Sequence, residues 1–142
     1  SRIRSKDTHP EMLVRRGLHA SGFRYSLHSV RLPGHPDLVL PKYRAAIWIN
    51  GCFWHGHNCG AARLPATNQS YWSPKIARTQ GRDKKHREAL DALGWRSLTV
   101  WECALRGKHR RGAEAVLADI EQWILTGTAS SEISGDSIFP PP

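Results

Sequence analysis

The sequence contains no long apolar run, no internal repeat and only three cysteines among its 142 residues. A membrane-spanning helix needs about 20 predominantly apolar residues, so an ordinary transmembrane segment is excluded. Three cysteines are an odd and small set for a disulfide framework. This favours a reducing compartment, with metal binding as the use of the thiols, and we expect a cytoplasmic protein.

Acidic residues are also scarce, because 12 Asp and Glu stand against 21 Lys and Arg, giving a net charge of +9. The hydrophobic fraction of 39%, with six tryptophans, excludes a disordered basic tail and suffices for a single globular domain. Much of the positive charge lies in two short segments, 78–87 and 108–111. The balance favours a polyanionic partner, most often nucleic acid, over a basic protein whose charges are merely solvated.

Hydrophobic periodicity and turn residues predict alternating helices and strands. Thr8, Pro10 and Glu11 have the pattern of a capped helix start, and the helix should end near Ala20. Strands are expected at 23–28, 37–40, 45–50 and 95–101, helices at 82–93 and 113–125, and irregular segments at 51–60 and 63–70. This order predicts an α/β domain over residues 1–126, with a mixed central sheet of about four strands flanked by helices. The Ser- and Gly-rich residues 127–142 are expected to form a flexible tail.

Cysteine and histidine residues concentrate in the irregular segment after the third strand. Cys52, His57 and Cys59 offer two thiolates and an imidazole, which are the ligands that zinc prefers. Cys103, just after the fourth strand, would complete a three-cysteine, one-histidine set. His55 competes with His57 as the histidine ligand, and the spacing leaves that choice open. Buried free thiols beside two surface histidines are the alternative.

Three acidic residues and one histidine lie at the ends of elements or on the irregular segment. They are Glu11, Asp37, His55 and Asp83. Taken singly, each has a structural explanation: a helix cap, a turn residue, a loop histidine and a helix-start carboxylate. In a small α/β domain these ends can converge, and carboxylates with a histidine on a basic protein are the parts of a metal-dependent phosphodiesterase. Phe53 and Trp54, on the same segment, are either packing residues or a pair that wedges between bases.

Taken together, the motifs resemble the very short patch repair (Vsr) DNA mismatch endonucleases. The resemblance runs in order from about Ser5 to Leu125. Its most specific parts are the GCFWHGHNC segment at 51–59 and the WEC motif at 101–103. The other parts are Ser5-Lys6-Asp7, Leu32-Pro33-Gly34-His35-Pro36-Asp37, Trp72-x-x-Lys75-Ile76, Arg82-Asp83 and Leu93-Gly94-Trp95-Arg96.

The resemblance implies a restriction-endonuclease-like fold and a bacterial protein that associates with the nucleoid when bound to DNA. It implies Mg²⁺-dependent hydrolysis that nicks one strand 5′ to the T of a T:G mismatch, the lesion left when 5-methylcytosine deaminates. Duplex DNA with that mismatch is the implied substrate, and mismatch-repair proteins are candidate partners.

Individual site residues follow from the same resemblance. Asp37 and the main-chain carbonyl of Ile49 would bind Mg²⁺. His55 would activate water, while Glu11 and Asp83 would act through metal-bound waters. The remaining implied residues are the structural zinc ligands Cys52, His57, Cys59 and Cys103, and the intercalating pair Phe53 and Trp54.

The sequence departs from the family pattern at two places. Asn50 stands where well-studied members carry a second catalytic histidine, and an amide cannot exchange protons at neutral pH. Either His55 suffices with Asn50 as a hydrogen-bond donor, or activity is reduced. In the family, an N-terminal segment that would precede Ser1 reaches the minor groove. It is largely missing here, and we expect this to weaken DNA binding or mismatch specificity. The alternative functions are a homing- or restriction-type nuclease on matched DNA and a catalytically weak, zinc-stabilised DNA-binding module.

Overall fold

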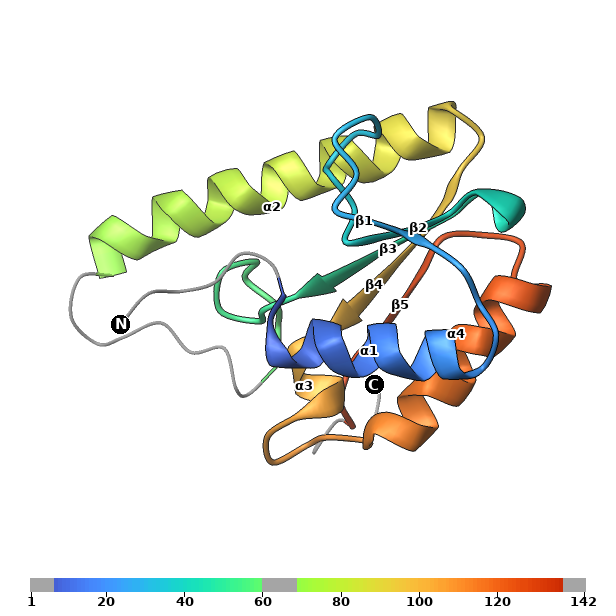
Figure 1. Cartoon of the computed structure of the whole chain (residues 1–142). Coiled ribbons are helices and arrows are strands. Elements are labelled where there is room, and N and C mark those ends of the chain that lie inside the picture. Colours follow the sequence, from blue (N-terminus) through green and yellow to red (C-terminus); the bar gives the residue numbers. More distant parts are fainter. Residues whose placement is uncertain (1–6, 60–68, 137–142) are drawn as a thin grey trace.

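A computed structural model of the chain describes residues 7–59 and 69–136 (Figure 1). It is an α/β fold in which five strands form one sheet in the order β1-β2-β3-β4-β5. The strands are β1 (Ser26–Leu27), β2 (Leu38–Leu40), β3 (Ala45–Asn50), β4 (Arg96–Trp101) and β5 (Ser131–Ile133). The helices are α1 (His9–Ala20), α2 (Gln69–Ala92), α3 (Glu102–Leu105) and α4 (Ala113–Thr126), with a 3-10 turn η1 (Pro41–Tyr43).

The strand pairing brings distant parts of the sequence to one edge of the sheet. Strands β3 and β4 are parallel, with a register that ends at Asn50 opposite Trp101. The segments that follow these two residues therefore leave the sheet side by side. Strands β2 and β3 are antiparallel, so the start of β2 also lies beside the end of β3. This edge collects Asp37, the 51–59 segment and Cys103.

Helices cover both faces of the sheet, with α1 and α4 on one side and α2 on the other (Figure 1). The main core lies between the sheet and the α1–α4 pair, where Ile47 and Val100 pack with Val14 and Ile120. All four are fully buried, and each such side chain contributes roughly 1.5–3 kcal/mol by leaving water. A Cβ at Gly17 would overlap the side chain of Leu117, so glycine permits the close approach of α1 and α4.

Several predicted elements have the expected bounds. Helix α1 begins after Thr8, whose hydroxyl accepts the Glu11 N–H at 3.4 Å, and it ends at Ala20. Strand β3 spans the predicted 45–50, and β4 and α4 differ from prediction by one residue at one end. The 51–59 segment is irregular, as predicted. No helix in the described ranges has the length and apolar character needed to cross a membrane.

Three expectations about the elements were wrong. The strand predicted at 23–28 is confined to Ser26–Leu27. Helix α2 begins at Gln69 rather than at residue 82, although Pro74 lies inside it, and in its first turn Trp72 packs against Phe53 and Trp54. The predicted loop at 63–70 is therefore helical at its last two residues, while 63–68 lie outside the described residues.

The expected flexible tail is also partly structured. Residues Ser131–Ile133 form β5, which pairs in parallel with β4 and makes a fifth strand. Beyond it, the Asp136 N–H donates to the His109 carbonyl at 2.8 Å. Ile133 is buried against the core, and this burial outweighs the loop-like composition of the segment. The rest of the predicted tail, 137–142, lies outside the described residues.

Candidate functional site

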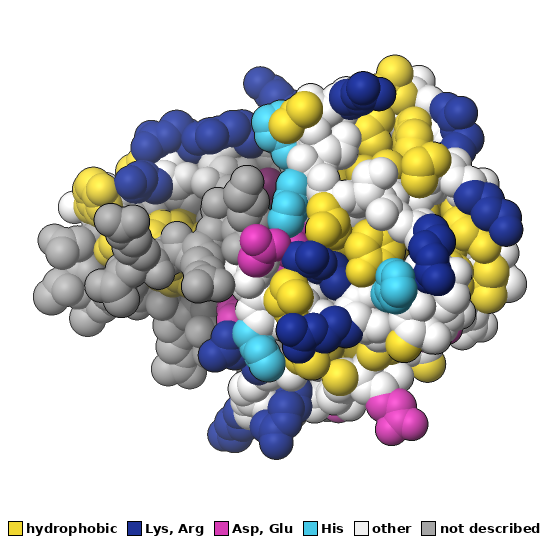
Figure 2. Space-filling view, viewed as in Figure 1, with side chains coloured by type: hydrophobic (Ala, Val, Ile, Leu, Met, Phe, Trp, Pro, Cys, Tyr) yellow, Lys and Arg dark blue, Asp and Glu magenta, His cyan; other side chains and the backbone are white. Residues whose placement is uncertain are grey.

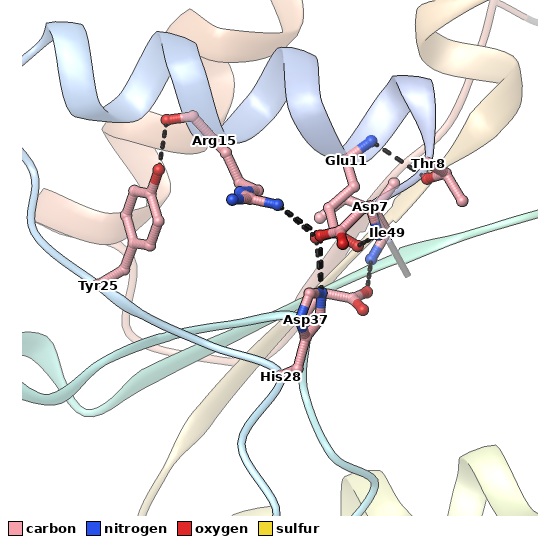
Figure 3. Close-up of polar contacts among 8 residues, drawn as sticks. All are labelled: Asp7, Thr8, Glu11, Arg15, Tyr25, His28, Asp37 and Ile49. Atoms are coloured by element: carbon pink, nitrogen blue, oxygen red, sulfur yellow. Dashed lines mark hydrogen bonds and ion pairs between the residues drawn. The ribbon is translucent and has the colours of Figure 1, made fainter. Parts of the chain in front are cut away.

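Asp37 lies immediately before β2, where its side chain faces the end of β3. Its Oδ2 accepts the main-chain N–H of Ile49 at 2.8 Å (Figure 3). Burial is the main cause that raises the pKa of Asp37 from 3.8 to about 6, and the nearby Glu11 carboxylate raises it further. The Ile49 N–H, His28 and His55 oppose this change in pKa. A desolvated carboxylate of this kind is a good ligand for a hard cation such as Mg²⁺.

Glu11 projects from the first turn of α1 toward Asp37, and its side chain is only 2% exposed. Oε1 accepts the Asp7 N–H at 3.2 Å, so the capping-box bond goes to Asp7 rather than to Thr8. Oε2 lies 2.7 Å from His28 Nε2 and 3.4 Å from Arg15 Nη1 (Figure 3).

His28 was missed by sequence reasoning. The sequence placed it at the end of a predicted strand with no motif around it. Only the antiparallel pairing of β1 with β2, which continues as a His28 N–H bond to the Asp37 carbonyl at 2.9 Å, places it at the site.

His55 and Asp83 form a second histidine–carboxylate pair on the other side of Asp37. His55 Nδ1 lies 2.7 Å from Asp83 Oδ2. The pair joins the 51–59 segment to α2, and a second contact reinforces it: Gln80 Nε2 donates to the Gly56 carbonyl at 2.9 Å. Gly56 has φ +62° and no room for a Cβ beside Gln80, so glycine is required at this contact.

Asn50 is 9% exposed at the end of β3. Together with Asp83 and Arg87 it lines a small cavity beneath α2, whose remaining walls are Trp48 and Thr99. Asn50 therefore belongs to the His55–Asp83 side of the site.

The predicted Cys and His residues converge on one centre. The ligand atoms of Cys52, His57, Cys59 and Cys103 all lie within 4.8 Å of one another, and Cys103 Sγ is 3.6 Å from His57 Nδ1. Zinc–ligand bonds of about 2.0–2.3 Å require distances of this order between the ligands of a tetrahedral site. Burial lowers the pKa of His57, which favours the neutral, metal-binding imidazole. The four residues therefore fit a structural zinc ion, whereas His55 is paired with Asp83.

The segment that includes β5 supports this centre. The Gly135 N–H donates to Cys103 Sγ at 3.2 Å. The ring of Trp101 stacks on His57, with centroids 4.1 Å apart and planes at 8°, and its Nε1–H donates to Glu132 at 3.0 Å. Both contacts involve residues of the segment 127–142, Gly135 and Glu132, which its composition predicted to be a flexible tail.

Comparisons with known proteins agree with the motifs. A family model described as DNA mismatch endonuclease Vsr matches residues 1–61. The chain is 39% identical over 136 residues to the DNA mismatch endonuclease Vsr of Escherichia coli (strain K12), covering 96% of this chain and 87% of the relative. It is 48% identical over 103 residues to the type II nicking enzyme V.XorIIP of Xanthomonas oryzae pv. oryzae, covering 72% and 76%. It is 43% identical over 107 residues to V.NmeAIP of Neisseria meningitidis serogroup A, covering 75% and 76%.

The chain belongs to the Vsr family of DNA mismatch endonucleases. It is accordingly a DNA endonuclease of the nicking type, and DNA is its partner. The resemblance noted in the sequence is thereby confirmed, and the nuclease class fits a site built from carboxylates and histidines.

An aromatic cluster in this Vsr-family chain adjoins the 51–59 segment. Phe53 and Trp54 lie edge to face with centroids 5.0 Å apart. Trp72, from the first turn of α2, completes the cluster at 5.3 Å from Phe53 and 5.4 Å from Trp54. All three rings are partly exposed. Trp72 was named only as part of a family motif, and its contact with the pair depends on a part of α2 that the sequence had not predicted to be helical.

Basic side chains line α2 beside the aromatic cluster. Figure 2 shows Lys and Arg gathered along this helix, at the upper left of the view. The exposed members are Lys75, Arg78, Arg82, Lys84 and Lys85. Four of them, at spacings of three and four residues, share one flank of the helix. Such a row of cations suits the phosphate backbone of DNA, which fixes position but carries no sequence information.

Proposed function

We propose that this Vsr-family endonuclease nicks one strand of duplex DNA 5′ to the T of a T:G mismatch, in a Mg²⁺-dependent reaction. The proposal rests above all on Asp37, a half-buried, desolvated carboxylate with a raised pKa that lies between two histidine–carboxylate pairs. The fold that carries this site is, in this proposal, a restriction-endonuclease-like core.

The side chain of Asp37 and the main-chain carbonyl of Ile49 would hold the Mg²⁺. Bound there, the ion would neutralise charge that develops on the scissile phosphate and on the leaving 3′ oxygen. Asp37 is suited to this because the Ile49 N–H fixes one of its oxygens.

His55 is the group that we assign to water activation. When its Nδ1–H donates to Asp83, the imidazole is held in the tautomer with an unprotonated Nε2. That nitrogen can accept a proton from the attacking water. Glu11, held on the opposite side, would orient water through its carboxylate. Asn50 would contribute a hydrogen-bond donor beside Asp83.

The zinc centre and the aromatic pair have supporting roles. Zinc held by Cys52, His57, Cys59 and Cys103 would fix the segment that also carries His55, Phe53 and Trp54. The aromatic pair would insert beside the mismatch, which requires unstacking of the duplex and favours a weakened base pair. The basic flank of α2 would contact the phosphates.

The test is nicking of strand-labelled duplexes that contain one T:G mismatch in several flanking contexts, with matched T:A duplexes beside them. Wild type should nick the T strand alone in Mg²⁺ and not in EDTA. Asp37→Asn should not nick, while Glu114→Gln, which changes an exposed carboxylate on α4, should nick normally. Equal nicking of T:A duplexes would favour a matched-DNA nuclease. Binding without any nicking would favour a DNA-binding module.

A further inference from the structure

The site contains a histidine that the sequence motifs and the comparisons leave unassigned. His28 lies directly across from Asp37 in the antiparallel ladder, with its main-chain N–H on the Asp37 carbonyl at 2.9 Å. Its φ is +46°, in the left-handed region that non-glycine residues seldom adopt. In this conformation its side chain reaches the Glu11 carboxylate beneath α1 (Figure 3). Such conformations persist only where the surrounding structure holds them, and they cluster at functional sites.

Glu11 depends on His28 for its orientation. A carboxylate that is 2% exposed needs hydrogen-bond donors, because it has lost nearly all of its water. The His28 contact at 2.7 Å is the shortest of its three side-chain contacts. Arg15 is directed mainly at Asp7, at 2.7 Å, and lies 3.4 Å from Glu11.

The arrangement repeats on the two sides of Asp37. His55 pairs with Asp83 at 2.7 Å on the α2 side, and His28 pairs with Glu11 at 2.7 Å on the α1 side. Both histidines act electrostatically on Asp37. The first pair uses a histidine in a family motif, whereas the second uses one that only the strand pairing brings into place.

We infer that His28 is a positioning residue of the nicking reaction, which donates its Nε2–H to Glu11 and holds that carboxylate toward Asp37. The inference rests on the proposed function. With Oε2 fixed by His28 and Oε1 by the Asp7 N–H, Glu11 can keep its remaining lone pairs aimed at water beside Asp37. Partners of this kind orient the groups around a metal, and their removal typically costs about 10- to 100-fold in metal affinity or activity.

The experiment compares His28→Ala, His28→Gln and the control His35→Ala on the T:G duplex. His35 is an exposed histidine with nearly the same backbone conformation, φ +45°, and no side-chain hydrogen bond or ion pair to any residue in the described ranges. We expect His28→Ala to lower kcat by about 10-fold or more without raising KM. Gln can still donate a hydrogen bond, so His28→Gln should recover most of the loss. His35→Ala should behave as wild type.

Binding of Mn²⁺ to the protein–duplex complex, measured by electron paramagnetic resonance, gives a readout that does not depend on turnover. His28→Ala should weaken it by about 10-fold. Wild-type kcat and Mn²⁺ affinity in His28→Ala would overturn the inference. The inference would also be overturned if His28→Gln had no higher kcat than His28→Ala together with a lowered melting temperature, because that result indicates a purely structural role.

A double-variant cycle tests whether His28 acts through Glu11. In a Glu11→Gln background, His28→Ala should lower kcat only a little further. An undiminished loss of kcat in that background would overturn the inference. If wild type nicks no duplex, the proposed function fails. The Mn²⁺ affinities of His28→Ala and wild type then decide this inference separately.

Discussion

Replacing Asp37 by Asn should stabilise the metal-free protein while it removes nicking. Burial raises the pKa of the Asp37 carboxyl from 3.8 to about 6, so the folded state disfavours its ionised form. At pH values above 6 this costs the wild type about 3 kcal/mol of folding free energy. The cost declines as the pH falls through 6, because the carboxyl then protonates in the folded protein, and it vanishes below about 4. Asn carries no charge and can still accept the Ile49 N–H.

The assay is urea unfolding in Mg²⁺-free buffer, monitored by tryptophan fluorescence, at intervals from pH 4 to 8. The free energy of unfolding of Asp37→Asn should exceed that of wild type by up to about 3 kcal/mol at pH 8 and by little at pH 4. Glu114→Gln, the exposed control, should show no such trend. With Mg²⁺ present the advantage of Asn should shrink, since bound metal stabilises the wild type. An equal or lower stability of Asp37→Asn at pH 8 would refute the reasoning.

Three further predictions each concern the replacement of one residue. Gly135→Ala would place a Cβ 2.5 Å from the Cys103 carbonyl oxygen and break the N–H bond to its thiolate. Because bonds to charged groups contribute about 1.5–3 kcal/mol, zinc affinity in chelator competition should fall by roughly 10- to 100-fold, and an unchanged affinity contradicts this. Gly81→Ala, in α2 with no atom within 4 Å of the added Cβ, should stabilise the protein by about 0.5–1 kcal/mol, and a lowered melting temperature would contradict this. Trp54→Ala should weaken binding to the T:G duplex by about 1–3 kcal/mol, with Trp54→Phe intermediate; equal loss on matched duplex argues against stacking at the mismatch.

The elements that sequence predicts best are those whose signals are local. Strand β3 is a continuous apolar run between turn residues, and α4 shows its buried stripe at helical spacing. Helix α1 carries its own cap at Thr8. In each case the residues that define the element lie within it or directly beside it, so no knowledge of the tertiary structure is needed.

The missed features depend on partners far away in the sequence. The first half of α2 packs its aromatic ring, Trp72, against Phe53 and Trp54, and these contacts are invisible to local propensity. Strand β5 is short and polar, and it forms because β4 offers an edge. His28 enters the site only through the pairing of β1 with β2.

For the candidate site, the sequence predicts which residues take part, and the structure shows which of them pair with one another. The spacing of Cys52, His57 and Cys59 pointed to a metal but left His55 and His57 equivalent. The geometry separates them, because His57 lies among the thiols and His55 contacts Asp83. Such a distinction depends on ring orientation relative to two elements, which spacing does not encode.

The pairing of side chains explains why a cation is expected at Asp37 rather than at another acid of the site. Glu11 is in contact with His28 and Arg15, and Asp83 is in contact with His55. Among residues 7–59 and 69–136, the only hydrogen bond found to the Asp37 side chain comes from the neutral Ile49 N–H. A desolvated carboxylate whose one hydrogen bond comes from a main-chain N–H is costly, and a bound divalent cation lowers that cost. The two histidines therefore share one effect: because they pair with the neighbouring acids, Asp37 is left as the carboxylate that a bound metal stabilises most.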